Sequence, residues 1–176
     1  MAATPGGLPY PALTDAPDVA YWNQQLAQAV EARIANRPRC KIVAGATQTL
    51  ATSPLTVDFA GGTVAYDTNG MADIPNDQIV IKTAGWYRIS ARLVFVSNAT
   101  GYRALVVQRN GSEFILDDYR PAVSGTVTII TVTSEPILLA VSDTIRLQAA
   151  QNNNPLSLIT ANGRYSHLAV DWVAGQ

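Results

Sequence analysis

The sequence predicts an all-β fold, an antiparallel jelly-roll β-sandwich that is preceded by an extended proline-rich arm and one α-helix. In residues 84–97, apolar residues such as Tyr87 and Ile89 alternate with Arg88 and Arg92, which is the period of a strand with one buried face. Beyond the helix, Thr, Val and Ile become frequent, and turn residues recur about every eight to twelve positions. Both observations indicate many short strands that pack face to face.

Short antiparallel strands account for the chain from residue 41 onward. The Asn110–Gly111 step is the strongest hairpin signal, because both residues accept the positive φ of a tight turn. We expect about ten strands, at residues 41–50, 55–59, 63–66, 78–82, 86–97, 102–109, 113–118, 126–135, 144–150 and 164–173. The predicted sandwich core comprises Tyr87, Ile89, Leu93, Phe95, Ile145, Leu147, Leu168, Val170 and Trp172.

The predicted organisation has three parts: an extended N-terminal arm at residues 1–14, a helix at residues 15–38 and the jelly-roll domain at residues 39–176. The arm contains three prolines and two adjacent glycines, which oppose regular helix or sheet and favour an extended, partly polyproline conformation. Such a segment has no core of its own. We therefore expect the arm to dock on a partner or on a neighbouring subunit.

The helix prediction rests on its ends and on its apolar spacing. Asp15 is a suitable N-cap and Pro38 stops the helix after Arg37. Apolar residues three or four apart form one stripe, which consists of Val19, Trp22, Leu26, Val30 and Ile34. A lone helix cannot bury this stripe. The helix therefore either packs against the same helix of other copies, so that it trimerises or anchors the chain, or packs on its own domain.

Composition limits the kinds of partner. Twelve Lys and Arg against thirteen Asp and Glu give a net charge of −1, so we expect no nucleic-acid binding. Charged residues are only 14%, which leaves a largely neutral surface and favours subunit contacts. The N-terminal residues resemble no export signal, and no apolar run is long enough to predict membrane insertion.

Candidate catalytic residues are few. His167, the sole histidine, falls on the polar face of the last strand, where we expect an ordinary surface or interface role. Cys40, the sole cysteine, lies between Arg39 and Lys41 at the junction of helix and domain, and we interpret it as structural. We therefore predict a protein that is not an enzyme and that has no cofactor.

One loop is a weak calcium candidate. Asp67, Asn69, Asp73 and Asp77 crowd a short segment, and their oxygen atoms are the ligands that Ca²⁺ prefers. The spacing does not match an EF-hand. An ordinary turn, in which Asn and Asp satisfy backbone groups, explains the same residues without a metal.

The β-domain resembles the trimeric jelly rolls of the tumour-necrosis-factor and complement-globular-head superfamily. The matching segments follow the order of that superfamily: VDFAGGTVAYDTNGM (57–71), AGWYRISARLVFVS (84–97), the Asn110–Gly111 hairpin, ILLAVSDTIRLQA (137–149) and SHLAVDWV (166–173). The resemblance implies chains that assemble around a threefold axis through apolar faces of the jelly roll.

The N-terminal part has a different resemblance. The segment YPALTDAPDVAYWNQQLAQAVEARI (10–34) is similar to the opening of tail-associated proteins from phages of actinobacteria. In those proteins a proline-rich lead and a short alanine-rich helix precede a fibre domain. The similarity implies an arm that attaches the β-domain to a virion.

Together these resemblances imply a phage virion protein, a homotrimeric tail-tip or tail-fibre component that is made in the host cytoplasm and lies on the exterior of the tail or head. Residues 1–40 would contact other virion proteins, and the jelly roll would bind a protein, a host-surface receptor or a glycan. A capsid-attached head fibre or decoration protein is an alternative. A lectin-like carbohydrate-binding domain with its site around Tyr119 and Asn152 is another.

Overall fold

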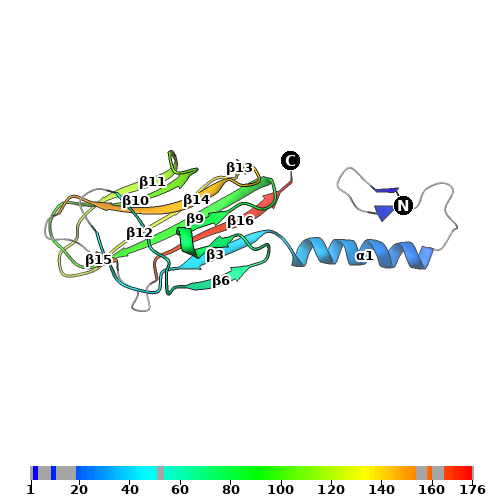
Figure 1. Cartoon of the computed structure of the whole chain (residues 1–176), viewed down its shortest axis with the longest axis horizontal. Coiled ribbons are helices and arrows are strands. Elements are labelled where there is room, and N and C mark those ends of the chain that lie inside the picture. Colours follow the sequence, from blue (N-terminus) through cyan, green and yellow to red (C-terminus); the bar gives the residue numbers. More distant parts are fainter. Residues whose placement is uncertain are drawn as a thin grey trace. The chain divides into compact units, whose positions relative to one another are not determined.

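The computed structural model describes residues 2–3, 9–10, 19–50, 54–153, 158–159 and 165–175 of the 176-residue chain. The chain divides into two compact units, Met1–Arg37 and Pro38–Gln176. The second unit contains the described strands from β3 onward, and every pairing between them is antiparallel (Figure 1).

The first unit contains helix α1 (Val19–Ala35) and two short strands, β1 (Ala2–Ala3) and β2 (Pro9–Tyr10). β1 and β2 pair antiparallel, so the prediction that the arm contains no regular sheet was wrong. Each of these strands is only two residues long. The predicted start of the helix at residues 15–18 lies outside the described residues. No helix in the described part of the chain is long and apolar enough to cross a bilayer.

One layer of the β-domain is the β9 sheet. Its central strand β9 pairs with β16 on one side and with β12 and β13 on the other, while β3 and β6 continue the sheet beyond β16. β15 pairs with the end of β9 and with β4. The strands of this sheet are β3 (Arg39–Val43), β4 (Gln48–Thr49), β6 (Thr63–Asp67), β9 (Gly85–Phe95), β12 (Thr128–Thr133), β13 (Ile137–Leu139), β15 (Leu158–Ile159) and β16 (His167–Ala174).

The opposing layer is the β14 sheet, with strand order β11-β10-β14-β8-β7 and with β5 also paired to β14. The hairpin between β10 and β11 turns at Asn110–Gly111, where both residues have positive φ, as the sequence predicted. Its strands are β5 (Leu55–Thr56), β7 (Ala72–Asp73), β8 (Gln78–Val80), β10 (Tyr102–Arg109), β11 (Glu113–Pro121) and β14 (Thr144–Gln151). A short 3₁₀ turn, Ile74–Asn76, separates β7 from β8.

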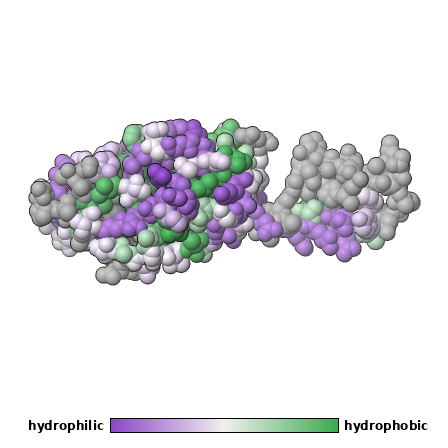
Figure 2. Space-filling view, in the orientation of Figure 1, coloured by the Kyte–Doolittle hydropathy of each residue, from purple (hydrophilic) through white to green (hydrophobic). Residues whose placement is uncertain are grey.

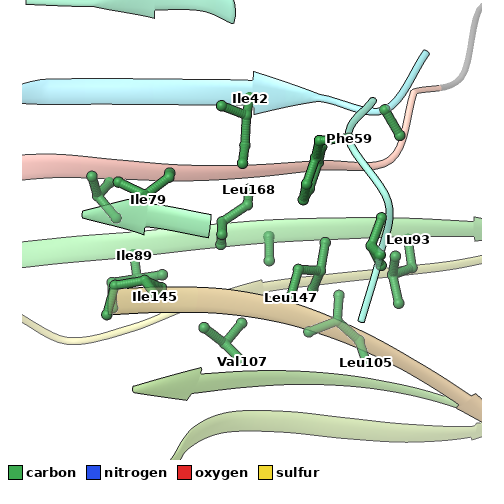
Figure 3. Close-up of a cluster of buried hydrophobic side chains, with 14 of the residues drawn as sticks. Ile42, Phe59, Ile79, Ile89, Leu93, Leu105, Val107, Ile145, Leu147 and Leu168 are labelled. Atoms are coloured by element: carbon green, nitrogen blue, oxygen red, sulfur yellow. The ribbon is translucent and has the colours of Figure 1, made fainter. Parts of the chain in front are cut away.

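The core lies between the two sheets. Alternate residues of β9, β16 and β3 point inward and meet alternate residues of β10, β14 and β8, so side chains from both layers interdigitate (Figure 3). Fully buried members include Ile42, Phe59, Ile79, Ile89, Leu93, Leu105, Val107, Ile145, Leu147 and Leu168. Tyr87, Phe95 and Val170 are also fully buried, and Trp172 is partly buried against this cluster.

One predicted strand is interrupted in the structure, and the short strand β13 was not predicted. The segment predicted at residues 41–50 divides into β3 and β4, because Gly45 passes so close to Gly61 that a Cβ at Gly45 would overlap the Gly61 carbonyl oxygen. The segment predicted at residues 126–135 ends at Thr133 as β12, and β13 follows beyond Pro136. Proline cannot donate to a strand ladder, which explains the break.

Candidate self-association and ligand-binding surfaces

The apolar stripe of α1 is exposed within the single chain. Val19, Leu26 and Val30 are 69%, 41% and 37% exposed, although their spacing is that of a buried helix face. Trp22 is half-buried, and its ring meets the Tyr21 ring edge-on with centroids 5.3 Å apart. The side chain of the fifth predicted stripe residue, Ile34, lies outside the described residues. The described stripe is therefore available to another helix.

The outer face of the β9 sheet carries a row of cations. On β9, Arg88 and Arg92 alternate with the core residues, and strand register places them beside the outward residues of β16 and then of β3. Arg88 is aligned with Asp171 and Arg39, while Arg92 is aligned with His167. We call this set the basic ladder; it comprises Arg39, Lys41, Arg88 and Arg92.

One carboxylate, Asp171, lies within the basic ladder. Burial raises the pKa of Asp171, and the positive charges of Arg39 and Lys41 only partly oppose this rise. Arg39 also lies over the ring of Tyr66, with its guanidinium carbon 5.2 Å from the ring centroid. Four cations against one carboxylate leave this face net positive, in a chain whose total charge is −1.

His167 lies in the same surface, between Val43 on β3 and Arg92 on β9. Burial lowers its pKa, and the positive charges of Lys41 and Arg92 lower it further. The imidazole is therefore neutral at pH 7. Its cross-strand neighbours are a valine and a cation, an arrangement that suits a packed surface better than proton transfer.

Exposed apolar side chains gather at one end of the β-domain. Trp86 on β9 is in register with Leu138 on β13 and with Ala174 on β16. We call the exposed set the apolar end patch; it comprises Trp86, Leu138, Val141 and Val173. Figure 2 shows apolar residues gathered at the end of the domain where β13 lies. Large exposed side chains of this kind are typical of protein contact surfaces.

Asp67 holds its loop through backbone hydrogen bonds. Its carboxylate accepts the N–H groups of Asn69, Met71 and Ala72 at 2.8–3.1 Å. Burial alone would raise the pKa of Asp67, but N–H donors from Ala72, Met71, Asn69 and Gly70 together lower it. The carboxylate thus stabilises the turn between β6 and β7.

The other two carboxylates among the calcium candidates, Asp73 and Asp77, are also engaged by N–H donors, and the Asn69 amide donates to the Thr83 hydroxyl. Asp73 accepts hydrogen bonds from the Asn76 and Gln78 side chains, and Asp77 accepts one from the backbone of Phe59. Within the described ranges, no three His, Cys, Asp or Glu side chains form a metal-binding group. A Ca²⁺ ion would have to displace these donors, so the hydrogen bonds explain the loop without a metal.

The predicted lectin-like site lies at one end of the β10–β11 hairpin. The rings of Tyr102 and Tyr119 are 5.7 Å apart and tilted, and Tyr119 is exposed. Asn152 accepts the N–H of Tyr102, so the structure does bring these residues together. Exposed aromatic rings beside amide and carboxylate groups are one arrangement that contacts sugars.

Cys40 faces the core. Burial raises the pKa of its thiol to about 12, and the charges of Asp67 and Asp171 raise it as well. The thiol is therefore protonated and unreactive at pH 7. The neighbouring cations Arg39 and Lys41 point away from it, because successive side chains alternate across a strand.

Sequence reasoning missed the basic ladder as a unit. It placed Arg39 and Lys41 at the junction of helix and domain and started a strand at residue 41, whereas the structure places both residues in β3. The alternation of Arg88 and Arg92 with core residues was a usable signal for one half of the ladder. The other half depends on strand register, which the sequence does not state.

No family model matches the chain, and no curated protein matches its sequence. Solved structures do resemble it. Murine APRIL at pH 5.0 is 14% identical, with a TM-score of 0.61 over 78% of this chain and 99% of that one. Eiger TNF from S. frugiperda is 11% identical, with a TM-score of 0.58 over 80% of this chain and 96% of that one.

The globular domain of the zebrafish complement 1qA protein is 11% identical, with a TM-score of 0.58 over 80% of this chain and 100% of that one. At such low identity the likeness shows the fold alone. The predicted antiparallel jelly roll of the TNF and complement type is confirmed.

The Asp67 turn generates a prediction about pH. Because its pKa is lowered, the Asp67 carboxylate stabilises the fold above its unfolded-state pKa of about 3.9, and this contribution is lost as pH falls through the folded pKa. We expect Asp67→Asn to reduce the free energy of unfolding by about 1–3 kcal/mol at pH 7. Urea denaturation at pH 7 and pH 3 measures this.

At pH 3 the difference between wild type and Asp67→Asn should shrink, since protonation weakens the wild-type interaction as well. Glu135→Gln, at an exposed residue, is the matched control. An equal loss of stability at both pH values would show that the charge of Asp67 does not support the turn.

Proposed function

We propose that the chain is a non-enzymatic structural protein of a phage virion, a homotrimeric tail-tip or tail-fibre component. Its N-terminal part would anchor it, and the jelly roll would be displayed for binding a protein or a host surface. The observation that carries this proposal is the exposed apolar stripe of α1 in a chain that also has a jelly-roll domain. An isolated helix of this length is marginal in water, so such a stripe is stabilised when another apolar surface covers it.

Self-association of the β-domain is supported by its own surface. Two residues of the apolar end patch, Trp86 and Leu138, lie on the outer face of the β9 sheet together with the basic ladder. Apolar and aromatic groups with arginines are enriched in protein interfaces. A copy of the chain that covers this face would bury the exposed Trp86 ring.

Attachment to a virion is supported by the similarity of residues 10–34 to tail-associated phage proteins. These residues fall within Met1–Arg37, which is a compact unit of its own, as an attachment segment would be. Capsid attachment would use the same parts, so the head-fibre alternative differs only in where this unit docks. The proposed location is the virion exterior, after synthesis in the host cytoplasm.

A lectin-like carbohydrate-binding domain is the second candidate. The paired Tyr102 and Tyr119 rings support it, because the exposed Tyr119 ring offers a flat apolar surface at the end of a hairpin. This candidate is compatible with a virion location, where the ligand would be a host-surface glycan.

Trimerisation is tested by charge insertion in the full chain. We expect Leu26→Asp in the helix stripe and Trp86→Asp in the apolar end patch each to raise the dissociation constant about tenfold or more, equivalent to about 1.4 kcal/mol. A buried carboxylate without a partner is the physical reason. Sedimentation velocity over a concentration series measures the change.

The matched controls are Gln24→Asp, on the polar side of α1, and Ser112→Asp, at the tip of the β10–β11 hairpin. Both should leave association unchanged. If Leu26→Asp and Trp86→Asp associate like wild type, neither surface holds the copies together.

The virion proposal is tested by immunogold electron microscopy of purified phage particles, with an antibody against the β-domain. Label at the tail tip or fibres is the expected result. Label confined to the capsid would select the head-fibre alternative and reject the tail assignment. Unlabelled particles, from a preparation whose lysate contains the protein, would contradict a virion role.

A further inference from the structure

Arg103 is a fully buried arginine at one end of the sandwich. It lies near the start of β10 on the same side as Leu105 and Val107, which belong to the core between the sheets. Its exposed fraction is 0%, and it is among the largest side chains buried to this degree. Arginine is almost never fully buried unless its charge is paired.

The guanidinium of Arg103 is only partly satisfied. Its Nη1 donates to the backbone oxygens of Thr100 at 3.3 Å and Tyr102 at 2.7 Å. Its Nε and Nη2 atoms are buried and have no hydrogen-bond partner in the structure as described. These two nitrogens form one edge of the guanidinium, the edge that binds two oxygens of a carboxylate or oxyanion in parallel.

Among the described residues, no carboxylate is paired with this edge. The ion pairs among the described residues join Arg109 to Glu113 and Arg120 to Asp118. Arg120 is itself the cross-strand neighbour of Arg103 on β11, so the nearest charge in register has the same sign. Segments 51–53, 154–157 and 160–164 contain no Asp or Glu in their sequence.

Other buried polar atoms at this end also lack partners. Gln151 is the β14 neighbour of Arg103; its Nε2 donates to the Leu50 oxygen, while its Oε1 has no partner among the described residues. Thr128 Oγ1, on the edge strand β12, is buried and likewise unpartnered within the described ranges. Donors and acceptors are thus both left over, as expected where a small polar species is enclosed.

The charge of Arg103 cannot be removed by deprotonation. Burial lowers its pKa, but a guanidinium stays protonated in proteins at neutral pH. An unpaired ion in the interior is strongly unfavourable. Asp118, in register with Leu105 on β11, is engaged by Arg120, so an added anion would satisfy the Nε and Nη2 atoms of Arg103.

We propose that the interior of the β-domain at Arg103 binds a small oxyanion, whose oxygens accept hydrogen bonds from Nε and Nη2. A hydroxyl of the ion, as in hydrogen phosphate or bicarbonate, donates to the free acceptor of Gln151. Because these atoms are closed off from solvent, the ion enters during folding or when the loop that holds Thr100 opens. The site is a bound structural anion and is independent of the trimer proposal.

The test is equilibrium urea denaturation of the full chain in phosphate, with chloride holding the ionic strength constant. An ion that binds only the folded state lowers the unfolding equilibrium constant about tenfold for each tenfold rise in phosphate above the dissociation constant. Wild type should show this dependence. Arg103→Met, which replaces the charged arginine with an apolar side chain of similar length, should lose the phosphate dependence.

Arg109→Met is the matched control, because Arg109 lies at the other end of the same strand and is paired with Glu113. It should retain the phosphate dependence. Equal dependence in Arg103→Met and wild type, or none in wild type, would overturn the proposal. A crystal grown in arsenate tests the site without a variant: an anomalous peak beside Nε and Nη2 of Arg103 is expected, and its absence would contradict the site.

Discussion

The fold depends on the two-sided pairing of β9. This strand is hydrogen-bonded to β16 along one edge and to β12 and β13 along the other, so its side chains can point only inward or outward. A shift of one residue in its register would expose Ile89 and Leu93 and bury Arg88 and Arg92. The hydrophobic core therefore fixes the register, and the register fixes what the outer surface presents.

The inward face of β9 thus stabilises the core, and its outward face forms part of the candidate contact surface. Inward residues pack against β10 and β14, whereas outward residues align with β16 and β3 to form the basic ladder and part of the apolar end patch. Asp67 adds a local constraint of the same kind, because its carboxylate organises the loop between the layers. The candidate surface is a consequence of strand alternation, with no additional loop or insertion required.

The sequence was sufficient to predict the jelly roll and the tight turn at Asn110, since periodicity and turn chemistry are local properties. It did not show that Gly45 approaches Gly61, because the distance in space between these two segments depends on how the whole domain folds. The basic ladder was hidden for the same reason. Arg103 was detectable in principle, since it shares the core-facing parity of Leu105 and Val107, but a charged residue at a strand start is normally exposed.

The helix and the jelly roll each have exposed apolar side chains, and these are the physical basis of the proposed self-association. An alternative in which the chain functions alone would leave Val19, Leu26 and Trp86 in water at a cost in solubility. Only 14% of the residues are charged, so charged side chains would add little solubility to offset this exposure. Self-association explains both uncovered surfaces with one assumption.

The measurement that tests this account most directly is the mass of the purified full chain in solution by multi-angle light scattering. The chain is 18.7 kDa, so a trimer has three times that mass, about 56 kDa. A stable mass near this value over a range of concentrations is the predicted result. A mass of 18.7 kDa that does not rise with concentration would contradict the account.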